Sequence, residues 1–202
     1  MIQPKHRTLR GPVTVTGVGV HTGARCSLTF RPDAVGPGIR FRRLDLPGSP
    51  DIPADLDHVA GTELGTNLAL GDQASVRTVE HVMAALSACG ITRAVVEIDG
   101  PEPPILDGSF KGYFEAIRGA ESVELGDDFR VLRLEAPLTL NEAPGSGNYV
   151  VVPSTDFRVS ATIEFAHPVI GRQYGSFNLA NGAFEREIAP ARTFGFESEA
   201  EA

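Results

Sequence analysis

The stretch that decides the fold reads SVRTVEHVMAAL over residues 75–86, and it places an acid and an imidazole next to each other at the predicted start of a helix. Ser75 or Thr78 can act as the N-cap, because a side-chain oxygen there accepts a hydrogen bond from the N–H groups that the first turn leaves unpaired. Apolar residues then recur at helical spacing and define one stripe: Val79, Val82, Met83, Leu86 and Cys89. Gly90 follows at the position where a left-handed residue commonly ends a helix. The pattern therefore predicts a helix that ends at Cys89.

Glu80 and His81 fall away from the centre of this stripe, so we expect the core to leave both side chains free. In the first turn, the positive end of the helix dipole stabilises Glu80 and disfavours protonated His81, which leaves a ring lone pair for a metal. An imidazole that holds a metal and a carboxylate that acts on metal-bound water can work in one cleft. A Glu-His pair in a first turn is more often a solvated helix end. The pair alone therefore leaves both interpretations open.

The composition indicates a globular protein and argues against a nucleic-acid surface. The 202 residues include 26 acidic and 18 basic ones, for a net charge of −8, and no basic run is longer than Arg42-Arg43. Nucleic-acid affinity depends largely on Lys and Arg that neutralise phosphates. No apolar h-region follows Met1–Arg7, and no apolar run approaches a transmembrane segment. We therefore expect a cytoplasmic protein, in which Cys26 and Cys89 are small buried side chains rather than a disulfide or metal pair.

The first part of the chain is predicted to be strand-rich with two helices. Alternating or continuous apolar patterns predict strands at residues 11–19, 24–30, 39–44 and 94–99, with short strands and loops between 51 and 71. Asp107-Gly108-Ser109 can cap a second helix, whose apolar positions are Phe110, Tyr113, Phe114 and Ile117. Acidic and small residues then interrupt the pattern at 119–128, where we place a boundary.

The second part restarts with strands and ends in a helix. Strands are predicted at residues 129–134, 149–153 and 157–165, with a hairpin loop at 142–148. A helix is predicted around Phe184, Ile188 and Ala191, with Pro190 expected to kink or end it. Strands followed by a helix in each half predict an α+β fold and suggest a duplication. The predicted domains are 1–125, which contains the Glu80-His81 helix, and 126–202.

Four motifs carry a resemblance to a known family. They are GVGVHTG at 17–23, TVEHVMAAL at 78–86, PEPPILDGS at 101–109 and ARTFGF at 191–196. In this order they resemble the UDP-3-O-acyl-N-acetylglucosamine deacetylases, zinc amidases that commit Gram-negative bacteria to lipid A. The resemblance implies two similar α+β domains with their helices packed between two outer sheets. It also implies that the substrate is a UDP-linked acylated glucosamine, and nothing in the pattern predicts an oligomeric state.

The resemblance implies roles for individual residues. His81 matches a zinc ligand, and Glu80 matches the base that activates zinc-bound water. Thr193 matches a threonine whose hydroxyl helps to stabilise the oxyanion; the alternative is a capping hydroxyl at a helix end. Phe194 matches a residue beside the substrate, and His21 matches a histidine near the mouth of the active site.

The remaining zinc ligands are not among these motifs. A catalytic zinc site needs about three protein ligands, and the family takes the others from a downstream His-x-x-x-Asp helix, with a further histidine as general acid. The resemblance implies that these residues lie beyond Ala202, so that the second domain is incomplete and the 202-residue chain alone is inactive. Two alternatives stay open: a non-catalytic remnant of this fold that binds a nucleotide sugar or a protein, and an unrelated α+β interaction protein.

The other polar candidates have simpler interpretations. Asp107 is expected to form a turn and helix cap that organises the active-site loop, and not to be a metal ligand. His167 lies in a segment that also matches the family, but we assign it no metal. His6 and His58 belong to no motif and are expected at the surface.

Overall fold

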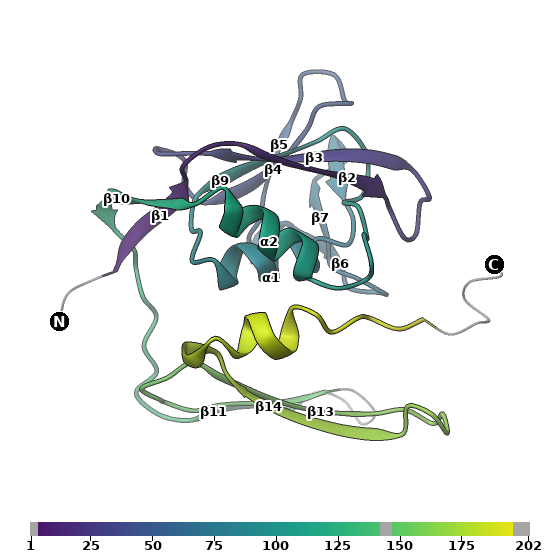
Figure 1. The fold of residues 1–202 in the computed structure, drawn as a ribbon, viewed down its shortest axis with the longest axis vertical. Coiled ribbons are helices and arrows are strands. Elements are labelled where there is room, and N and C mark those ends of the chain that lie inside the picture. Colours follow the sequence, from purple (N-terminus) through teal and green to yellow (C-terminus); the bar gives the residue numbers. More distant parts are fainter. Residues whose placement is uncertain (1–3, 142–146, 196–202) are drawn as a thin grey trace. The chain divides into compact units, whose positions relative to one another are not determined.

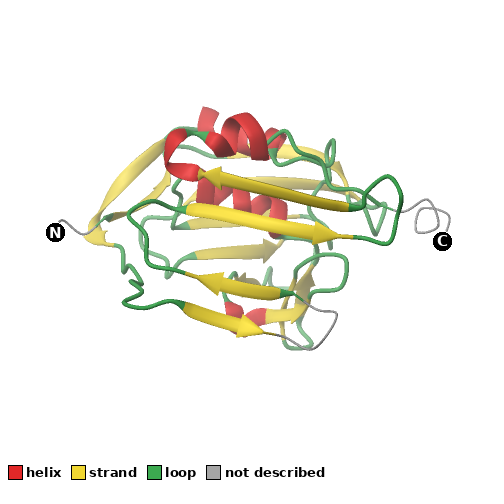
Figure 2. Cartoon of the chain, turned by 90° about the horizontal axis from the view of Figure 1, so that it is seen from below, coloured by secondary structure: helices red, strands yellow, loops and turns green. Residues whose placement is uncertain are grey.

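In the computed structural model, residues 4–141 and 147–195 are described, so most of the predicted hairpin loop at 142–148 lies outside the described residues. Strands predominate over a few short helices (Figure 2), and the α+β prediction is confirmed. The chain divides into two compact units. The first unit contains the described residues of Lys5–Asp128 and Glu185–Ala202, and the second unit those of Met1–Pro4 and Phe129–Phe184. The predicted domains 1–125 and 126–202 stay a prediction.

The first unit is built on a five-stranded sheet with two helices against it (Figure 1). The strand order is β2 (Val13–Val18), β3 (Arg25–Pro32), β9 (Ala94–Ile98), β4 (Ile39–Arg43) and β5 (Asp51–Pro53), with only β4 and β9 parallel. The helices are α1 (Glu80–Ala88) and α2 (Lys111–Gly119). Tyr113 of α2 meets Phe30 of β3 edge-on at 6.1 Å between ring centroids, and both side chains are fully buried. In the described chain, no helix combines the length and apolar character needed to cross a membrane.

Two smaller sheets complete the first unit. β1 (Lys5–Leu9) pairs antiparallel with β10 (Ser122–Asp128). A 3-10 turn (Leu56–His58) precedes the three-stranded sheet of β6 (Val59–Gly61), β7 (Asn67–Leu70) and β8 (Ala74–Val76). The strands predicted at 11–19, 24–30, 39–44 and 94–99, and the short strands after residue 51, are confirmed. β8 is important for the site because it leads directly into α1.

The prediction for α1 is wrong at its first end and confirmed at its last. The N-cap is Val79, which makes no side-chain cap hydrogen bond, so the predicted cap by Ser75 or Thr78 is wrong. Ser75 belongs to β8, and the Thr78 hydroxyl is taken by another partner, Glu102. At the other end Gly90 has φ +68° and donates to the carbonyl of Ser87 at 3.0 Å, while Ile91 donates to that of Leu86 at 2.9 Å. This Schellman arrangement confirms Gly90 as the residue that ends the helix.

The second unit consists of two antiparallel pairs. β11 (Leu138–Asn141) pairs with β12 (Asn148–Val151), and β13 (Arg158–Glu164) pairs with β14 (Arg172–Asn178), after which a 3-10 turn covers Leu179–Asn181. The strands predicted at 149–153 and 157–165 are confirmed. The strand predicted at 129–134 is wrong: the β1–β10 ladder ends at the Lys5–Asp128 pair, and although the N–H of Phe129 donates to the carbonyl of Pro4 at 2.7 Å, residues 129–134 form no strand.

A π-helical segment, Phe184–Ile188, occupies the place of the last predicted helix. Pro190 follows it, as expected of a residue without a backbone N–H. Within the first unit, Ala189 is buried and Glu185 forms an ion pair with Arg118 of α2. The described residues from Glu185 to Gly195 therefore belong to the unit that carries α1.

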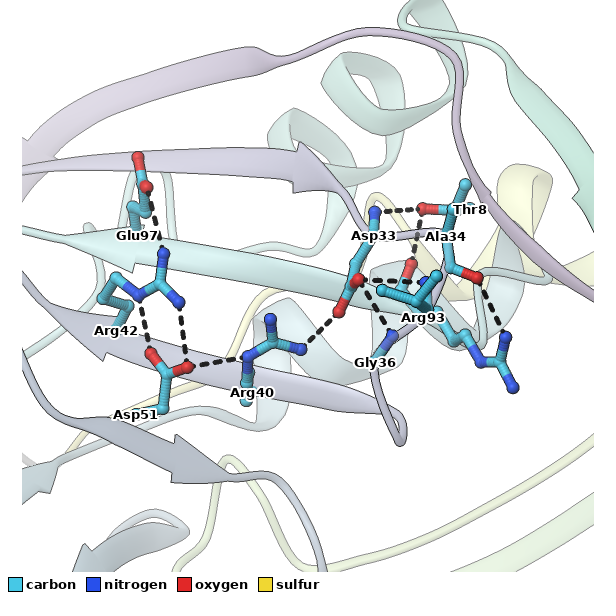
Figure 3. A network of polar contacts seen from close by, with 10 residues as sticks. Thr8, Asp33, Ala34, Gly36, Arg40, Arg42, Asp51, Arg93 and Glu97 are labelled. Atoms are coloured by element: carbon cyan, nitrogen blue, oxygen red, sulfur yellow. Dashed lines mark hydrogen bonds and ion pairs between the residues drawn. The ribbon is translucent and has the colours of Figure 1, made fainter.

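The five-stranded sheet carries a group of ion pairs that we call the sheet network: Asp33, Arg40, Arg42, Asp51 and Glu97 (Figure 3). Asp51 accepts from Arg40 at 2.8 Å and from Arg42 at 2.7 and 2.9 Å. Asp33 pairs with Arg40, and Glu97 lies 3.8 Å from Arg42. Each acid in the sheet network thus faces at least one arginine.

The two cysteines behave as apolar side chains. Cys26 is buried, Cys89 is half-buried, and both are free thiols. Burial raises the pKa of Cys26 to about 12 and that of Cys89 to about 11, so neither is a thiolate at neutral pH.

Candidate active site

Glu80 lies at the first position of α1 and is held by the loop that precedes β7. Its Oε2 accepts from the backbone N–H of Thr66 at 2.8 Å, and the N–H of Val79 donates to the Thr66 carbonyl at 3.0 Å. A Cβ added at Gly65 would lie 3.3 Å from Oε1, a tight contact that glycine avoids. Within residues 4–141 and 147–195, Oε1 of this half-buried carboxylate accepts no hydrogen bond. Glu80 is thus oriented through Oε2, and its Oε1 remains available to accept a hydrogen bond or a proton.

His81 is buried, which corrects the expectation that the core would leave it free. Only 8% of the residue is exposed, and its ring centroid lies 4.7 Å from that of Phe110, just before α2. The Nδ1 atom is buried and has no hydrogen-bond partner in the described part of the chain. A buried polar atom without a partner costs about 1–3 kcal/mol, and imidazole is a common metal ligand. An unpaired ring nitrogen next to a carboxylate fits a metal ligand better than a solvated helix end.

Thr193 and Phe194 lie in the segment that returns to the first unit. The Thr193 N–H donates to the carbonyl of Gly108 at 2.9 Å, and the neighbouring Arg192 forms an isolated antiparallel bridge with Ser109. These contacts join the segment to the loop that ends at Phe110, whose ring lies against His81. Thr193 is exposed, and Phe194 is 48% exposed. The backbone of Thr193 is thus tied to the loop that leads to Phe110, and the role of its hydroxyl stays a prediction.

Asp107 forms the turn that the sequence predicts, but the N-cap of α2 is Phe110, which makes no side-chain cap hydrogen bond, so the predicted helix cap by Asp107-Gly108-Ser109 is wrong. Oδ1 of Asp107 accepts from the N–H of Ser109 at 3.1 Å and from its hydroxyl at 2.7 Å, and the Ser109 oxygen accepts from the N–H of Lys111 at 3.2 Å. The Asp107 carboxylate also lies 3.6 Å from Arg192. The hydrogen bonds from Ser109 lower the pKa of Asp107. Asp107 thus fixes the start of α2 and contacts the residue before Thr193.

His21 reaches the same region from the other side. Its side chain is exposed, and Nε2 lies 3.2 Å from the carbonyl oxygen of Leu64. Leu64 and Thr66 belong to one loop, and Thr66 holds the Glu80 carboxylate. The structure therefore connects His21 to Glu80 through the loop before β7.

Glu102 is the residue that the sequence analysis missed, although it lies within a quoted motif. It is 1% exposed and accepts from the N–H and hydroxyl of Thr22, both at 2.9 Å, from the N–H of His21 at 3.1 Å and from the Thr78 hydroxyl at 2.8 Å. Burial acts to raise the pKa of Glu102, but these hydrogen bonds outweigh it and lower the pKa below the ordinary value. The only sequence signal is an acid within the apolar, proline-rich stretch PEPPIL.

The remaining histidines lie elsewhere and have ordinary contacts. Nδ1 of His6 lies 3.0 Å from the Thr92 hydroxyl, and Nδ1 of His58 lies 2.6 Å from Asp55. His167, in the second unit, accepts from the N–H of Val169 at 3.3 Å. Among the described residues, no cluster of three His, Cys, Asp or Glu side chains is arranged to hold a metal ion. Within those residues, His81 is therefore a single candidate ligand.

The fold and site define an α+β protein with an acid–imidazole pair at the start of a helix. The family described as LpxC, UDP-3-O-acyl N-acetylglycosamine deacetylase, matches residues 6–202, and the chain belongs to this family.

Several curated relatives resemble the chain along nearly all of its length. A UDP-3-O-acyl-N-acetylglucosamine deacetylase from Geotalea uraniireducens is 40% identical over 196 residues, which cover 97% of this chain and 63% of the relative. One from Thermosynechococcus vestitus is also 40% identical, with 97% of this chain and 67% of the relative covered. A bifunctional enzyme LpxC/FabZ from Chlorobaculum tepidum is 37% identical, and 42% of its length is covered. The chain thus spans about two thirds or less of the relatives it matches.

Proposed function

We propose that the full-length protein is a zinc-dependent deacetylase that removes acetate from UDP-3-O-acyl-N-acetylglucosamine, the committed step of lipid A biosynthesis in the cytoplasm of a Gram-negative bacterium. The observation that carries the proposal is the Glu80–His81 pair, in which the acid keeps one oxygen open and the buried imidazole has an unpaired nitrogen. Membership of the deacetylase family supplies the reaction class and the substrate.

The residues present fit one ligand position of a zinc site. His81 would bind the metal through its imidazole, while the described residues offer no three-residue ligand cluster. Since a catalytic zinc site uses about three protein ligands, we propose that the other ligands come from sequence beyond Ala202. When bound, zinc would polarise the amide carbonyl and lower the pKa of its water to about 7.

The chain's own residues would divide the remaining work. Glu80 would take the proton of the attacking water through Oε1, because Oε2 is occupied by the Thr66 amide. A general base of this kind typically contributes about 10²–10⁴-fold. The Thr193 hydroxyl would donate to the oxygen of the tetrahedral intermediate, where negative charge develops. Phe194 would pack beside the substrate, and His21 would lie near the entrance.

Zinc content and acetate release test the proposal on two proteins: the full-length protein that contains these residues and the chain of residues 1–202. We expect stoichiometric zinc and turnover of UDP-3-O-acyl-N-acetylglucosamine in the first, and weak zinc binding without turnover in the second. A full-length protein that binds the nucleotide sugar but neither binds zinc nor releases acetate would support the non-catalytic remnant instead. Zinc and turnover in residues 1–202 would mean that another histidine of this chain, such as His21, is a ligand.

A further inference from the structure

The Glu102 carboxylate is a buried anion that meets only uncharged donors. The two oxygens accept from three residues, Thr22, His21 and Thr78, and no arginine, lysine or histidine side chain of the described chain forms an ion pair with it. Buried carboxylates are usually paired with a cation. Here backbone and hydroxyl donors take that place, and these donors come from two segments far apart in sequence.

One of these segments contains Thr78, which has an unusual backbone. Its φ is +54°, a left-handed conformation that a β-branched residue rarely adopts. Two hydrogen bonds maintain it: the Thr78 N–H donates to Asn67 Oδ1 at 3.2 Å, and the hydroxyl donates to Glu102 at 2.8 Å. The N–H of Arg77 also donates to the carbonyl of Pro101 at 3.0 Å, next to Glu102. The turn that aims Glu80 and His81 is therefore fixed to the Glu102 segment.

The other segment is the loop that carries His21. A Cβ at Gly19 would overlap the Glu102 carboxylate and the Thr22 hydroxyl, so the loop closes around this anion only with glycine there. The His21 ring then contacts the carbonyl of Leu64, in the loop whose Thr66 amide holds Glu80. Glu102 thus reaches Glu80 by two routes, through Thr78 and through His21.

From this geometry we propose that Glu102 is a positioning residue: it fixes the strained Thr78 turn and the His21 loop, and so sets the directions in which Glu80 and His81 point. This assignment rests on the proposed function, because it takes Glu80 and His81 to be the catalytic pair. Strained backbone conformations persist where the surroundings over-determine them, and they concentrate at functional sites. Glu102 itself takes no part in bond making or breaking.

Glu102→Gln in the full-length protein is the first test. The amide keeps the size of the side chain but replaces one acceptor oxygen by an NH₂ group, which faces N–H and O–H donors. We expect kcat for deacetylation to fall about 10–100-fold, as for other residues that orient ligands, with KM changed less than about threefold. The visible spectrum of the cobalt-substituted protein should change as well, because the direction of the His81 ring changes.

Glu97→Gln is the matched control for lost stability. Glu97 is also a largely buried carboxylate, with 12% of its side chain exposed, but its partners Arg31 and Arg42 belong to the sheet. We expect this variant to lose thermal stability and to keep kcat and the cobalt spectrum. Equal losses of kcat in the two variants at equal stability would overturn the assignment.

Thr78 supplies a second pair of variants, in case Glu102→Gln does not fold. Thr78→Val keeps the shape and removes the hydroxyl that donates to Glu102, whereas Thr78→Ser keeps the hydroxyl. We expect Thr78→Val to lower kcat about 10-fold or more and Thr78→Ser to restore most of it. Equal kcat in the two variants would contradict a role for the contact with Glu102.

Amide hydrogen exchange separates this inference from the proposed function. If the full-length wild type does not deacetylate the substrate, the proposed function is wrong, but the Thr66 amide still reports on the orientation of Glu80. Positioning predicts faster exchange of this amide in Glu102→Gln and Thr78→Val and wild-type exchange in Glu97→Gln. Unchanged Thr66 exchange in both site variants would refute the positioning role regardless of activity.

Discussion

The sheet network and the Glu80–Glu102 region are two polar parts of the same unit, and they handle charge in opposite ways. In the sheet network the acids face arginines, as Asp51 does between Arg40 and Arg42. In the other region the carboxylates meet neutral donors only, and Nδ1 of His81 has no partner within the described residues. Charges that are already compensated favour one folded arrangement, whereas an uncompensated acid and an unpaired imidazole leave capacity for a ligand. We therefore expect the sheet network to serve stability and the Glu80–Glu102 region to serve ligand binding.

The largest effects should come from the Glu80–His81 pair. In the full-length protein, we expect Glu80→Ala to retain zinc and to lose about 10²–10⁴-fold in kcat, because proton transfer is removed. His81→Ala should instead release zinc, because a ligand is lost. Zinc content and kcat, measured together on each variant, check this division.

The division would fail in either of two ways. If Glu80→Ala also removes the zinc, the carboxylate is a ligand rather than a base. If His81→Ala keeps normal zinc content and activity, the unpaired Nδ1 of His81 in the wild type is not a zinc ligand. His58→Ala is a suitable control, since the His58 ring pairs with the exposed Asp55.

Thr193→Val should have the next largest effect. The hydroxyl is exposed, and the residue is held through its backbone N–H by Gly108, so valine can replace it without loss of that contact. If the hydroxyl stabilises the oxyanion, kcat should fall by an amount equivalent to about 2.7–4 kcal/mol of barrier, with little change in KM. Steady-state kinetics of the full-length variant test this, and a variant with a raised KM alone would make Thr193 a binding residue.

Disruption of the sheet network should affect stability and leave chemistry unchanged. In Asp33, Oδ1 accepts from the N–H of Gly36 at 3.0 Å and Oδ2 pairs with Arg40, and 8% of the side chain is exposed. We expect Asp33→Asn to lower the free energy of unfolding by about 1.5–3 kcal/mol, the range for hydrogen bonds to charged groups. Urea denaturation measures this loss of stability, and we expect kcat of the full-length variant to stay unchanged. A large loss of kcat would remove the distinction between the two regions.

The same network should make stability depend on pH at the acid end. Burial opposes ionisation of Asp33, but hydrogen bonds from Arg40 and from the Gly36 and Val35 amides outweigh it, so the pKa lies below its ordinary value of 3.8. The hydrogen bond from Arg42 lowers the pKa of Asp51. A depressed carboxyl pKa contributes stability that is fully present above the unfolded value and is lost as the pH falls through the folded value. The unfolding free energy should therefore be flat near neutrality and decline below about pH 4, less steeply in Asp33→Asn.

The smallest effect is expected for an exposed pair outside both regions. Lys111 and Glu115 lie 3.8 Å apart on α2, and more than half of each side chain is exposed. Glu115→Gln should change the unfolding free energy by no more than about 0.5 kcal/mol and should leave the pH profile as in the wild type. A larger change in the unfolding free energy would show that this exposed lysine pair stabilises the fold as much as the arginine pairs of the sheet network do.

Local patterns predicted much of the first unit. The alternation in β3 and β4, the stripe of α1 and the glycine at its end depend on neighbouring residues, so the sequence reveals them directly. Charged pairs of the sheet network were not predicted, because Asp33 and Arg40 meet only when β3 and β4 belong to one sheet. The strand expected at 129–134 fails for a similar reason, since the extent of a strand depends on its ladder, and the β1–β10 ladder ends at Asp128.

The sequence by itself determined the α+β class, the helix that begins with Glu80 and His81, and the motifs that carry the family resemblance. Only the tertiary structure decided that His81 is buried, because Phe110 approaches it from 29 positions later in the chain. Only the tertiary structure brought Glu102 against Thr22 and Thr78. The physical reason is the same in each case: periodicity reports which face of an element is apolar, whereas the partner of a polar side chain is chosen by chain segments that meet only in the folded protein.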